Sequence, residues 1–501
     1  MDRYLMGIDV GTSGSKVAVF NLEGEVMASA YHAYEIIYPY KGAMELDANE
    51  VFEAVLDCIE HCSKACSMEN VIALSVSTQG EAIILVDEND KPLLHAIVTF
   101  DSRNEKEYQW FSEQFSKEEI MQRTGMPMHT MFSATKILYL RNACKNEYDR
   151  AKKIMCFGDY ISYLLGASPA IDYTMASRTM LFDLREQKWS DRILKVCGMK
   201  KEMLSKPVKP GSVIGTMKEE YRERFGFSKE LKIVAGAHDQ VCCTIGAGIL
   251  EPGMVMDSLG TTESNVCVSK ELVITEQMMK ANIPVYAYPI GDLYAYMTFL
   301  TCSASILKWF KEKIVDDFSK DFFDKYAGYI EENCKEPTGL YVLPYFSGAG
   351  TPTMDFQAKG IIYGLTLDTD RYQIYKAIIE STCFEQRINL ENMEKNGIAI
   401  NELRCIGGGS KSDLILQVKA NITGKKVVKM KNGEIGCLGA AIIAGVGSKV
   451  ITDRNIINDK FTRTEKIFYP QKDQKEKYEK YYKEYVELYP VCCKLWQKKK
   501  G

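Results

Sequence analysis

Two segments of this sequence, about 250 residues apart, share one pattern of apolar and small polar residues. Residues 9–17 read Asp-Val-Gly-Thr-Ser-Gly-Ser-Lys-Val, and residues 258–266 read Ser-Leu-Gly-Thr-Thr-Glu-Ser-Asn-Val. In each, an apolar run ends in Gly-Thr, a short polar loop follows, and a second β-rich run begins, which is typical of a strand, a turn and a strand. A hairpin repeated at this distance predicts two duplicated domains, with a boundary near residues 250–253.

The runs around these hairpins alternate between strand and helix character. We predict strands at residues 4–10, 17–20, 71–77, 231–236 and 403–406, and helices at residues 48–66 and 412–423. Strands that alternate with helices indicate α/β domains. We therefore expect one domain over residues 1–250, a second over 251–450, and a charged helical tail over 451–501 that is exposed to solvent.

Charge and hydrophobicity favour an enzyme that acts on small molecules. The 501 residues carry 63 Lys and Arg against 67 Asp and Glu, a net charge of −4, so no basic field attracts nucleic acid or an anionic membrane. No apolar run approaches the roughly 18–20 residues of a membrane span, and Asp2, Arg3 and Asp9 interrupt the N-terminus where a secretory signal is apolar. We expect a cytoplasmic protein with small-molecule partners, with a homodimer as an open alternative for its assembly.

Three glycine-containing loops are candidates for binding phosphate. They are Gly11-Thr12-Ser13, Gly260-Thr261, and Gly407-Gly408-Gly409, of which the last precedes a predicted helix. Successive backbone N–H groups in such loops converge on one point, which suits phosphate oxygens. An ordinary turn is the simpler interpretation of either hairpin alone, and no Gly-x-x-x-x-Gly-Lys-Ser/Thr motif occurs. Three such loops in two domains nevertheless predict a nucleotide held between the domains.

Two carboxylates follow predicted strands and could support phosphoryl transfer. Asp9 lies at the end of the first strand beside a candidate phosphate loop, where it could hold Mg²⁺ directly or through water. Asp239 follows the strand at residues 231–236, where it could act as a general base. The pattern leaves structural roles equally open, because Asp9 could brace the hairpin and Asp239 could cap a helix.

Several motifs, in order along the chain, resemble those of the FGGY carbohydrate kinases. The strongest is Gly360-Ile361-Ile362-Tyr363-Gly364-Leu365 followed by residues 373–380, Gln-Ile-Tyr-Lys-Ala-Ile-Ile-Glu. Concordant matches are residues 9–13, Ala176-Ser177-Arg178, Pro344-Tyr345-Phe346-Ser347-Gly348, and residues 407–409 through 434–441. The resemblance implies two ribonuclease-H-like domains of the actin and hexokinase type, with a nucleotide cleft between them that closes on ATP and a sugar.

The resemblance also assigns roles to single residues. It implies Asp239 as the catalytic base, and Asp9 with Asp239 as the carboxylates next to Mg²⁺. It implies nucleotide contacts at Gly11, Thr12, Ser13, Lys16, Gly260, Thr261, Ala304, Lys308, Gly408, Gly409 and Ser412. It implies sugar contacts at Gln79, Glu81, Asp101, Arg103, Met131 and Gln240.

The sugar itself is less constrained, because the pocket residues match neither glycerol kinases nor xylulose kinases throughout. Gly80 stands where glycerol kinases have Arg, and Thr99 where xylulose kinases have Trp, so we expect room for a substrate larger than glycerol. Glu81, Asp101 and Gln240 accept hydrogen bonds, which suits a neutral polyhydroxylated molecule. We expect ATP-dependent phosphorylation of a sugar, polyol or sugar acid, with a xylulose-like pentulose as the best candidate and gluconate, fuculose, erythritol or glycerol as alternatives.

A nucleotide switch of the actin or chaperone type is the second hypothesis. The same duplicated fold would support it, because a fold does not fix a function. Such a switch has no need of a general base or a polar sugar pocket, and these residues therefore favour the kinase. A glycosidase with Asp101 and Asp239 as its paired carboxylates would leave the glycine loops without a role.

Overall fold

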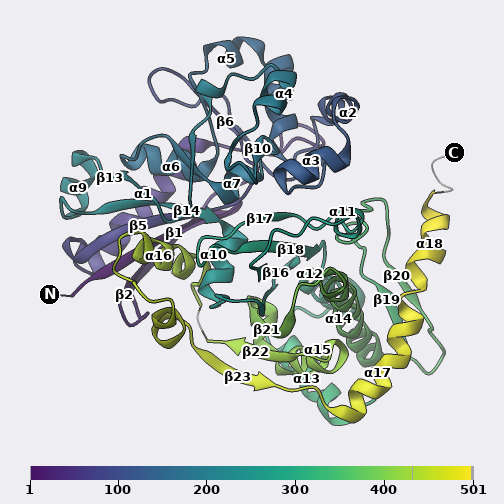
Figure 1. The fold of residues 1–501 in the computed structure, drawn as a ribbon. Coiled ribbons are helices and arrows are strands. Elements are labelled where there is room, and N and C mark those ends of the chain that lie inside the picture. The colour runs from purple at the N-terminus through teal and green to yellow at the C-terminus, as the bar shows by residue number, and fades with distance from the viewer. Residues whose placement is uncertain (1, 432, 498–501) are drawn as a thin grey trace.

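Two twisted β-sheets with the same topology form the centre of the molecule (Figure 1). The computed structural model describes residues 2–431 and 433–497. The strands of the first sheet are β1 (Tyr4–Val10), β2 (Gly14–Asn21), β3 (Val26–Ala33), β5 (Val71–Thr78), β13 (Val213–Thr216) and β14 (Lys232–His238). Those of the second are β15 (Gly253–Leu259), β16 (Glu263–Ser269), β17 (Val285–Ala287), β18 (Tyr294–Leu300), β21 (Ile400–Ile406), β22 (Lys426–Met430) and β23 (Thr464–Phe468).

The pairing of these strands confirms the duplication that the repeated hairpin predicts. In the first sheet, β1, β2 and β3 form an antiparallel meander, and β5 and β14 continue it in parallel with β1. In the second sheet, β15, β16 and β18 form the meander, and β21 and β22 continue it in parallel with β15. Each sheet ends in an antiparallel edge strand, β13 or β23. This arrangement is the actin and hexokinase type of α/β fold.

The first half of the chain also contains helices and short strand pairs. The helices are α1 (Ala48–Ala65), α2 (Glu105–Gln114), α3 (Lys117–Thr124), α4 (Ser133–Ala143), α5 (Lys145–Arg150), α6 (Phe157–Leu165), α7 (Tyr173–Ser177), α8 (Asp191–Cys197), α9 (Glu219–Phe225) and α10 (Asp239–Gly246). The pairs are β4 (Glu45–Leu46) with β7 (Ala96–Ile97), β6 (Ile84–Val86) with β8 (Lys153–Met155), β9 (Ala170–Asp172) with β12 (Lys206–Val208), and β10 (Phe182–Asp183) with β11 (Lys188–Trp189). Of these helices, α1, α6, α7 and α10 contact the first sheet.

The second half of the chain adds a further set of helices and one strand pair. The helices are α11 (Glu276–Lys280), α12 (Ala304–Trp309), α13 (Phe322–Asn333), α14 (Arg371–Lys395), α15 (Asp413–Thr423), α16 (Ile435–Gly447), α17 (Lys472–Tyr485) and α18 (Leu488–Gln497), and β19 (Tyr341–Leu343) pairs with β20 (Ile361–Tyr363). Within residues 2–431 and 433–497, no helix has both the length and the hydrophobicity that crossing a membrane requires.

Helix α16 packs on the first sheet, although it lies far along the chain (Figure 1). A Cβ atom on Gly7 of β1 would lie 1.8 Å from the carbonyl oxygen of Cys437 in α16. A Cβ atom on Gly439 of α16 would lie 1.8 Å from the carbonyl oxygen of Cys242 in α10. Only glycine permits such close backbone contact. Helices α10 and α16 therefore pack tightly against each other next to β1, with Cys242 and Gly246 of α10 at the contact.

The C-terminal segment is more deeply integrated than its composition predicts. Residues 451–501 were expected to form a solvent-exposed helical tail, but β23 completes the second sheet and α17 packs against α15. Tyr478, Tyr482 and Tyr485 on α17 are 2%, 6% and 1% exposed. These positions recur at helical spacing, so the charged residues between them occupy the solvent-facing side of an amphipathic helix.

Candidate active site

Parallel strands of the first sheet bring the predicted catalytic residues to one edge. Asp9 pairs in register with Ser77 of β5, and His238 of β14 pairs with Thr78. The chain segments that follow these strands therefore leave the sheet together, as the carboxyl ends of parallel strands do in α/β folds. Asp9, the segment after Thr78, and Asp239 meet there.

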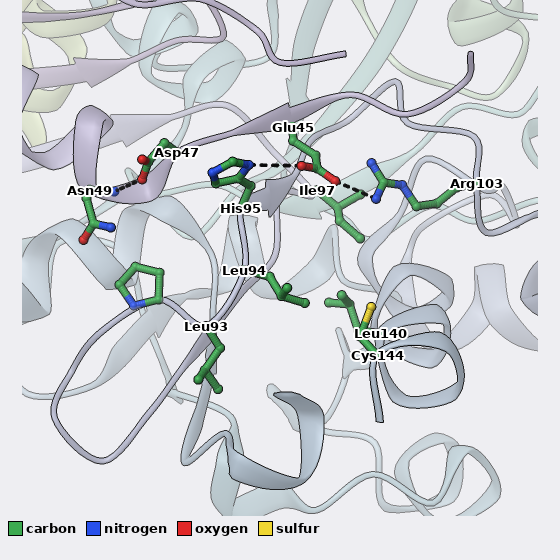
Figure 2. A pocket seen from close by; sticks show the side chains of 11 residues that line it. Glu45, Asp47, Asn49, Leu93, Leu94, His95, Ile97, Arg103, Leu140 and Cys144 are labelled. Atoms are coloured by element: carbon green, nitrogen blue, oxygen red, sulfur yellow. Dashed lines mark hydrogen bonds and ion pairs between the residues drawn. The ribbon is translucent and has the colours of Figure 1, made fainter. Parts of the chain in front are cut away.

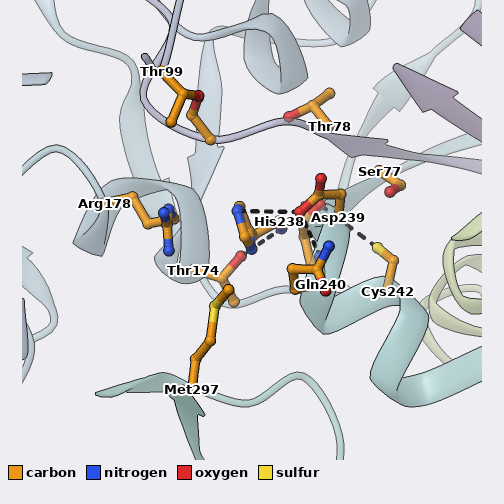
Figure 3. A network of polar contacts seen from close by, with 12 residues as sticks. Ser77, Thr78, Thr99, Thr174, Arg178, His238, Asp239, Gln240, Cys242 and Met297 are labelled. Carbon is orange, nitrogen blue, oxygen red and sulfur yellow. Dashed lines mark hydrogen bonds and ion pairs between the residues drawn. The ribbon is translucent and has the colours of Figure 1, made fainter. Parts of the chain in front are cut away.

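Asp239 is the first residue of α10, directly after β14 (Figure 3). Its side chain is 31% exposed, and its Oδ1 atom lies 3.1 Å from Nε2 of His238. Burial, with the nearby carboxylate of Asp9, raises the pKa of Asp239 to about 7. A carboxylate with a pKa near neutral can accept a proton efficiently at physiological pH.

Asp9 lies near the end of β1, which runs to Val10, and its carboxylate lies close to Ser77 and Lys16. The hydroxyl of Ser77 donates a hydrogen bond of 2.7 Å to Oδ1 of Asp9. Burial raises the pKa of Asp9, while Ser77 and Lys16 oppose that shift. Lys16 also forms an ion pair of 2.7 Å with Glu434, which lies just before α16. The predicted nucleotide residue Lys16 therefore joins the first sheet to the segment that leads into α16.

Glu81 and Arg178 form a buried ion pair next to Asp239. Glu81 is 1% exposed, and its Oε1 atom accepts from the Arg178 guanidinium. Its Oε2 atom accepts a hydrogen bond of 2.9 Å from the hydroxyl of Thr99. Glu81 has a φ angle of 62°, in the left-handed region that non-glycine residues rarely adopt and that often marks functional sites. The structure therefore holds this carboxylate in one orientation.

The expected free space beside Gly80 is absent. A Cβ atom on Gly80 would lie 2.6 Å from Nε of Arg178 and 3.0 Å from Cδ2 of His238. Arg178 thus fills the volume that the missing side chain leaves, and the hydroxyl of Thr99 bonds the carbonyl oxygen of Gly80 at 2.9 Å. The prediction that Gly80 and Thr99 make room for a larger substrate is wrong at this position, because a residue from a distant segment occupies that space.

His238 and Tyr286 complete the surroundings of Arg178, and sequence reasoning missed both. Burial and the charge of Arg178 lower the pKa of His238, so its imidazole is neutral, and its Nδ1 atom has no partner. Tyr286 lies on β17 of the second sheet, is fully buried close to Arg178, and donates from its hydroxyl to the sulfur of Met297 at 2.9 Å. Arg178 belongs to a quoted family motif, which was a usable signal. Tyr286 carries no such signal, because it sits in an apolar strand.

Two glutamine side chains leave buried oxygen atoms without partners. Gln79 donates from Nε2 to the carbonyl oxygen of Gly11 at 3.1 Å, and its Oε1 atom is buried and unpaired. Oε1 of Gln240, next to Asp239, is also buried and unpaired. Unpaired buried acceptors are costly, so they indicate where a ligand donates hydrogen bonds. Gln79 also connects the sugar-side residues to the Gly11 loop.

Arg103 lines a pocket of about 430 Å³, shown in Figure 2, and forms an ion pair with Asp101. Asp101 accepts from Nε of Arg103 at 2.8 Å and from the backbone of Met44 at 2.7 Å, and Arg103 donates to Glu45 at 2.7 Å. Glu45 also contacts His95 at 3.2 Å. Asp101 and Arg103, both predicted to contact the sugar, therefore have their charges paired within this region and stabilise its loop. Glu81, in contrast, lies with Arg178 beside Asp239.

Met131 lies where the two halves of the chain approach each other. Its backbone N–H donates to Nδ1 of His129 at 3.1 Å. The His129 ring in turn contacts Phe356 of the second half, with 5.2 Å between the ring centroids. Met131 is half-buried, so it could form one wall of a site between the domains.

The turns of the two repeated hairpins differ in length by one residue: Val10 pairs with Ser15 across a loop of four residues, and Leu259 pairs with Glu263 across a loop of three. In the first, the N–H of Gly11 donates to the carbonyl oxygen of Gly14 at 3.0 Å, and in the second, Gly260 donates to Thr262 at 3.0 Å. Thr12 is half-buried, and Ser13 and Thr261 are exposed. Both turns therefore leave hydroxyl groups accessible to a ligand.

The remaining nucleotide candidates lie near the second hairpin. Ser258 of β15 pairs in register with Ile406 of β21, so the Gly260 turn and the Gly407 loop leave the sheet at the same edge. The N–H of Ala304 donates to the carbonyl oxygen of Gly260 at 3.1 Å. Other predicted residues here are Lys308, exposed on α12, Gly408, which is exposed, Gly409, which is half-buried, and Ser412, which caps α15 by accepting from the N–H of Ile415.

Two sequence models of one family account for most of the chain. The N-terminal domain of the FGGY family of carbohydrate kinases matches residues 4–246, and its C-terminal domain matches residues 255–448. The chain belongs to this family. FGGY kinases are phosphotransferases that act on alcohol groups, so the protein is a carbohydrate kinase, and the nucleotide-switch hypothesis loses its support.

Individual relatives agree on the reaction class and differ in the substrate that they are named for. The glycerol kinase of Staphylococcus epidermidis is 28% identical over 484 residues, which cover 95% of each chain. The structure of a ligand-bound xylulose kinase from Lactobacillus acidophilus has a TM-score of 0.91 and 27% identity, and covers 99% of both chains. That of a gluconate kinase from Lactobacillus acidophilus has a TM-score of 0.91 and 26% identity, and covers 99% of this chain and all of the other. These similarities support the family and leave the sugar undetermined.

Proposed function

We propose that the protein transfers the γ-phosphoryl group of ATP to a hydroxyl of a small neutral sugar or polyol, with a xylulose-like pentulose as the preferred substrate. The observation that carries this proposal is Asp239, a partly exposed carboxylate with a pKa raised to about 7, next to the fixed Glu81 and Arg178 pair. Such a carboxylate can accept the proton of the attacking hydroxyl as the phosphoryl group leaves ATP.

The carboxylates of Asp9 and Asp239 fit a magnesium ion. The charge of Asp9 contributes to the raised pKa of Asp239, and a divalent cation there would relieve the repulsion between the two carboxylates. Within the described residues no group of three or more His, Cys, Asp or Glu could hold a metal by itself. Mg²⁺ commonly uses one or two carboxylates together with substrate phosphates and water, so two are enough. Bound there, Mg²⁺ would neutralise negative charge that develops on the phosphate oxygens.

The glycine loops of both domains would hold the nucleotide. Gly11, Thr12 and Ser13 approach from the first domain, and Gly260 and Thr261 from the second, with backbone N–H and hydroxyl donors that suit phosphate oxygens. Ala304, Lys308, Gly408, Gly409 and Ser412 would contribute around the second hairpin, and Lys16 around the first.

Replacing Thr261 by Val tests the nucleotide assignment. Thr261 is exposed in the second turn, and we expect loss of its hydroxyl to weaken ATP use by about 1–2 kcal/mol, the scale of one hydrogen bond to a charged group. The readout is kcat/KM for ATP, with circular dichroism to show that the fold is intact. Thr366→Val, at an exposed threonine whose hydroxyl bonds Thr369, is the matched control. An unchanged kcat/KM in Thr261→Val would remove Thr261 from the site.

The sugar side favours a neutral substrate. The buried oxygens of Gln79 and Gln240 lack donors, and hydroxyl groups of a sugar would supply them. A sugar acid such as gluconate also needs a cation for its carboxylate, but Arg178 and Arg103 already pair with Glu81 and Asp101. Gln79, Glu81, Gln240 and Met131 are therefore proposed as sugar contacts, with Asp101 and Arg103 as support for the loop behind them.

Glu81→Gln tests this pocket while keeping the size of the side chain. We expect the KM for the sugar to rise about tenfold or more, because a hydrogen bond to an ionised group is replaced by a weaker neutral one. The KM for ATP should stay within about twofold, because the nucleotide loops are untouched. The readout is steady-state kinetics with each substrate varied in turn. Equal rises in both KM values would mean that Glu81 has only a general structural role.

A further inference from the structure

A buried cluster of three charged residues lies behind the nucleotide loops of the second domain. Nζ of Lys419, on α15, lies 2.6 Å from Oδ2 of Asp257 on β15 and 2.6 Å from Oε1 of Glu263 on β16. The three side chains are 1%, 0% and 1% exposed. A buried ion cluster is costly to desolvate and gives little net stability, so a role in fixing geometry is a reasonable hypothesis for its presence.

Hydrogen bonds satisfy both carboxylates of the cluster. Nδ2 of Asn265 donates to Asp257 at 2.9 Å, and Sγ of Cys405 donates to Asp257 at 3.3 Å. The hydroxyl of Ser303 donates to Oε2 of Glu263 at 2.7 Å. A polar network with its partners satisfied holds its members in one arrangement.

The cluster fixes the segments that the proposed function assigns to the nucleotide. Asp257 and Glu263 lie on the two strands of the hairpin whose turn contains Thr261. Ser303, which bonds Glu263, also donates its N–H to the carbonyl oxygen of Thr261 at 3.0 Å, and the next residue, Ala304, donates to Gly260. Glu263 thus restrains the hairpin and the start of α12 together.

Lys419 extends the same restraint to a third segment. It lies on α15, which begins after the Gly407–Gly409 loop and is capped by Ser412. One ammonium group therefore links the helix that follows the glycine loop to both strands of the Thr261 hairpin.

We propose that Lys419 is a positioning residue for the nucleotide: it sets the spacing between the Gly260-Thr261 turn, the start of α12 and the Gly407 loop. The proposal rests on the nucleotide site assigned above. Lys419 itself does not touch ATP. Its removal should weaken nucleotide binding more than sugar binding.

Two variants and one control test this role. Lys419→Met removes the ammonium group, and Ser303→Ala removes only the bond of 2.7 Å between α12 and Glu263. The control is Lys376→Met on α14, since Lys376 is also a buried lysine that pairs with a carboxylate, Glu380, at 3.5 Å. Lys376 binds the carbonyl oxygens of Cys334 and Glu336, and contacts none of the three nucleotide segments through these bonds.

Titration with a fluorescent ADP analogue, without sugar, gives the decisive reading. We expect Kd to rise about tenfold or more in Lys419→Met and about threefold or more in Ser303→Ala, in line with lost hydrogen bonds to charged groups. Lys376→Met should lower Tm and leave Kd within about twofold. Steady-state kinetics should show the KM for ATP rising in the first two variants, with the KM for the sugar unchanged.

Other outcomes have distinct meanings. If Lys376→Met raises Kd as much as Lys419→Met, the cluster only stabilises the domain and the proposal fails. If Lys419→Met does not fold, Ser303→Ala decides, and an unchanged Kd there overturns the proposal. Failure of the wild type to bind the ADP analogue would instead contradict the proposed nucleotide site, and failure to phosphorylate any sugar would contradict the proposed substrate.

Discussion

Asp239→Asn is expected to lower kcat by about 100-fold or more while nucleotide binding stays nearly intact, because general-base catalysis contributes roughly 10²–10⁴ in rate. The asparagine keeps the size of the side chain and cannot accept the proton of the attacking hydroxyl. Asp239 lies at the start of α10, a helix that packs closely on α16, and Asn has the same size as Asp, so the substitution should not alter the backbone. Steady-state kinetics with the preferred sugar give kcat, and ADP titration gives nucleotide affinity.

Asp159→Asn is a suitable control for this experiment. Burial raises the pKa of Asp159 to about 7 as well, yet this residue lies on α6, where it accepts from the hydroxyl of Ser205 and caps its own helix. We expect its kcat to stay within about threefold of the wild type. A drop of less than about fivefold for Asp239→Asn, or an equal drop in both variants, would contradict the assignment of the base.

Arg178→Met is expected to destabilise the protein by about 3–5 kcal/mol, because it leaves the Glu81 carboxylate buried without its partner. Arg178 is 5% exposed, fills the space beside Gly80, and lies close to Tyr286 as well. Denaturant unfolding would measure the change through the shift of the midpoint.

Two further variants test whether the loss of stability in Arg178→Met comes from the unpaired Glu81 carboxylate. Arg185→Met, at an exposed arginine a few residues later, should change stability by no more than about 0.5 kcal/mol. Adding Glu81→Gln to Arg178→Met should recover part of the loss, since the unpaired charge is then gone. If Arg178→Met costs less than about 1 kcal/mol, or if the double variant is less stable still, the two residues do not form a buried ion pair.

The elements that local sequence specifies were predictable, and the structure confirms them. The predicted helix at residues 48–66 is α1 (Ala48–Ala65), and the predicted strand at 71–77 is β5 (Val71–Thr78). Both repeated hairpins form, because Gly-Thr between two β-rich runs encodes a turn within a few residues. Asp9 and Asp239 meet because Asp9 lies near the carboxyl end of β1 and Asp239 directly follows β14, and both strands run parallel to β5 in one sheet.

Contacts between segments that are far apart in the sequence could not be predicted from local patterns. Periodicity places Tyr286 in an apolar strand and cannot tell that β17 brings it to Arg178. Residue size suggests a gap at Gly80, whereas the side chain that fills it comes from nearly 100 residues later in the chain. A carboxylate and an arginine two residues apart suggest a binding site, but Asp101 and Arg103 can also neutralise each other, and the structure shows that they do.

A division into domains by sequence position alone also misses a contact between distant segments. Residues 435–447 lie within the second domain in sequence, but α16 packs on β1 and β5 of the first sheet. Glycines at its contact positions allow the helix backbone to approach β1 and α10, and a glycine pattern alone does not name the partner.

The central claim is that this protein phosphorylates a small neutral sugar, and a coupled assay of ADP release across a panel of substrates tests it most directly. The panel would hold pentuloses, hexuloses, aldonates, and polyols including erythritol and glycerol, at one ATP and Mg²⁺ concentration, with Asp239→Asn as the inactive reference. We predict that a xylulose-like pentulose gives the highest kcat/KM, with one sugar phosphate formed per ADP released, because a site built to bind hydroxyl groups rejects analogues that lack them. Glycerol as the best substrate, or no sugar raising ADP release above the rate without sugar, would contradict it.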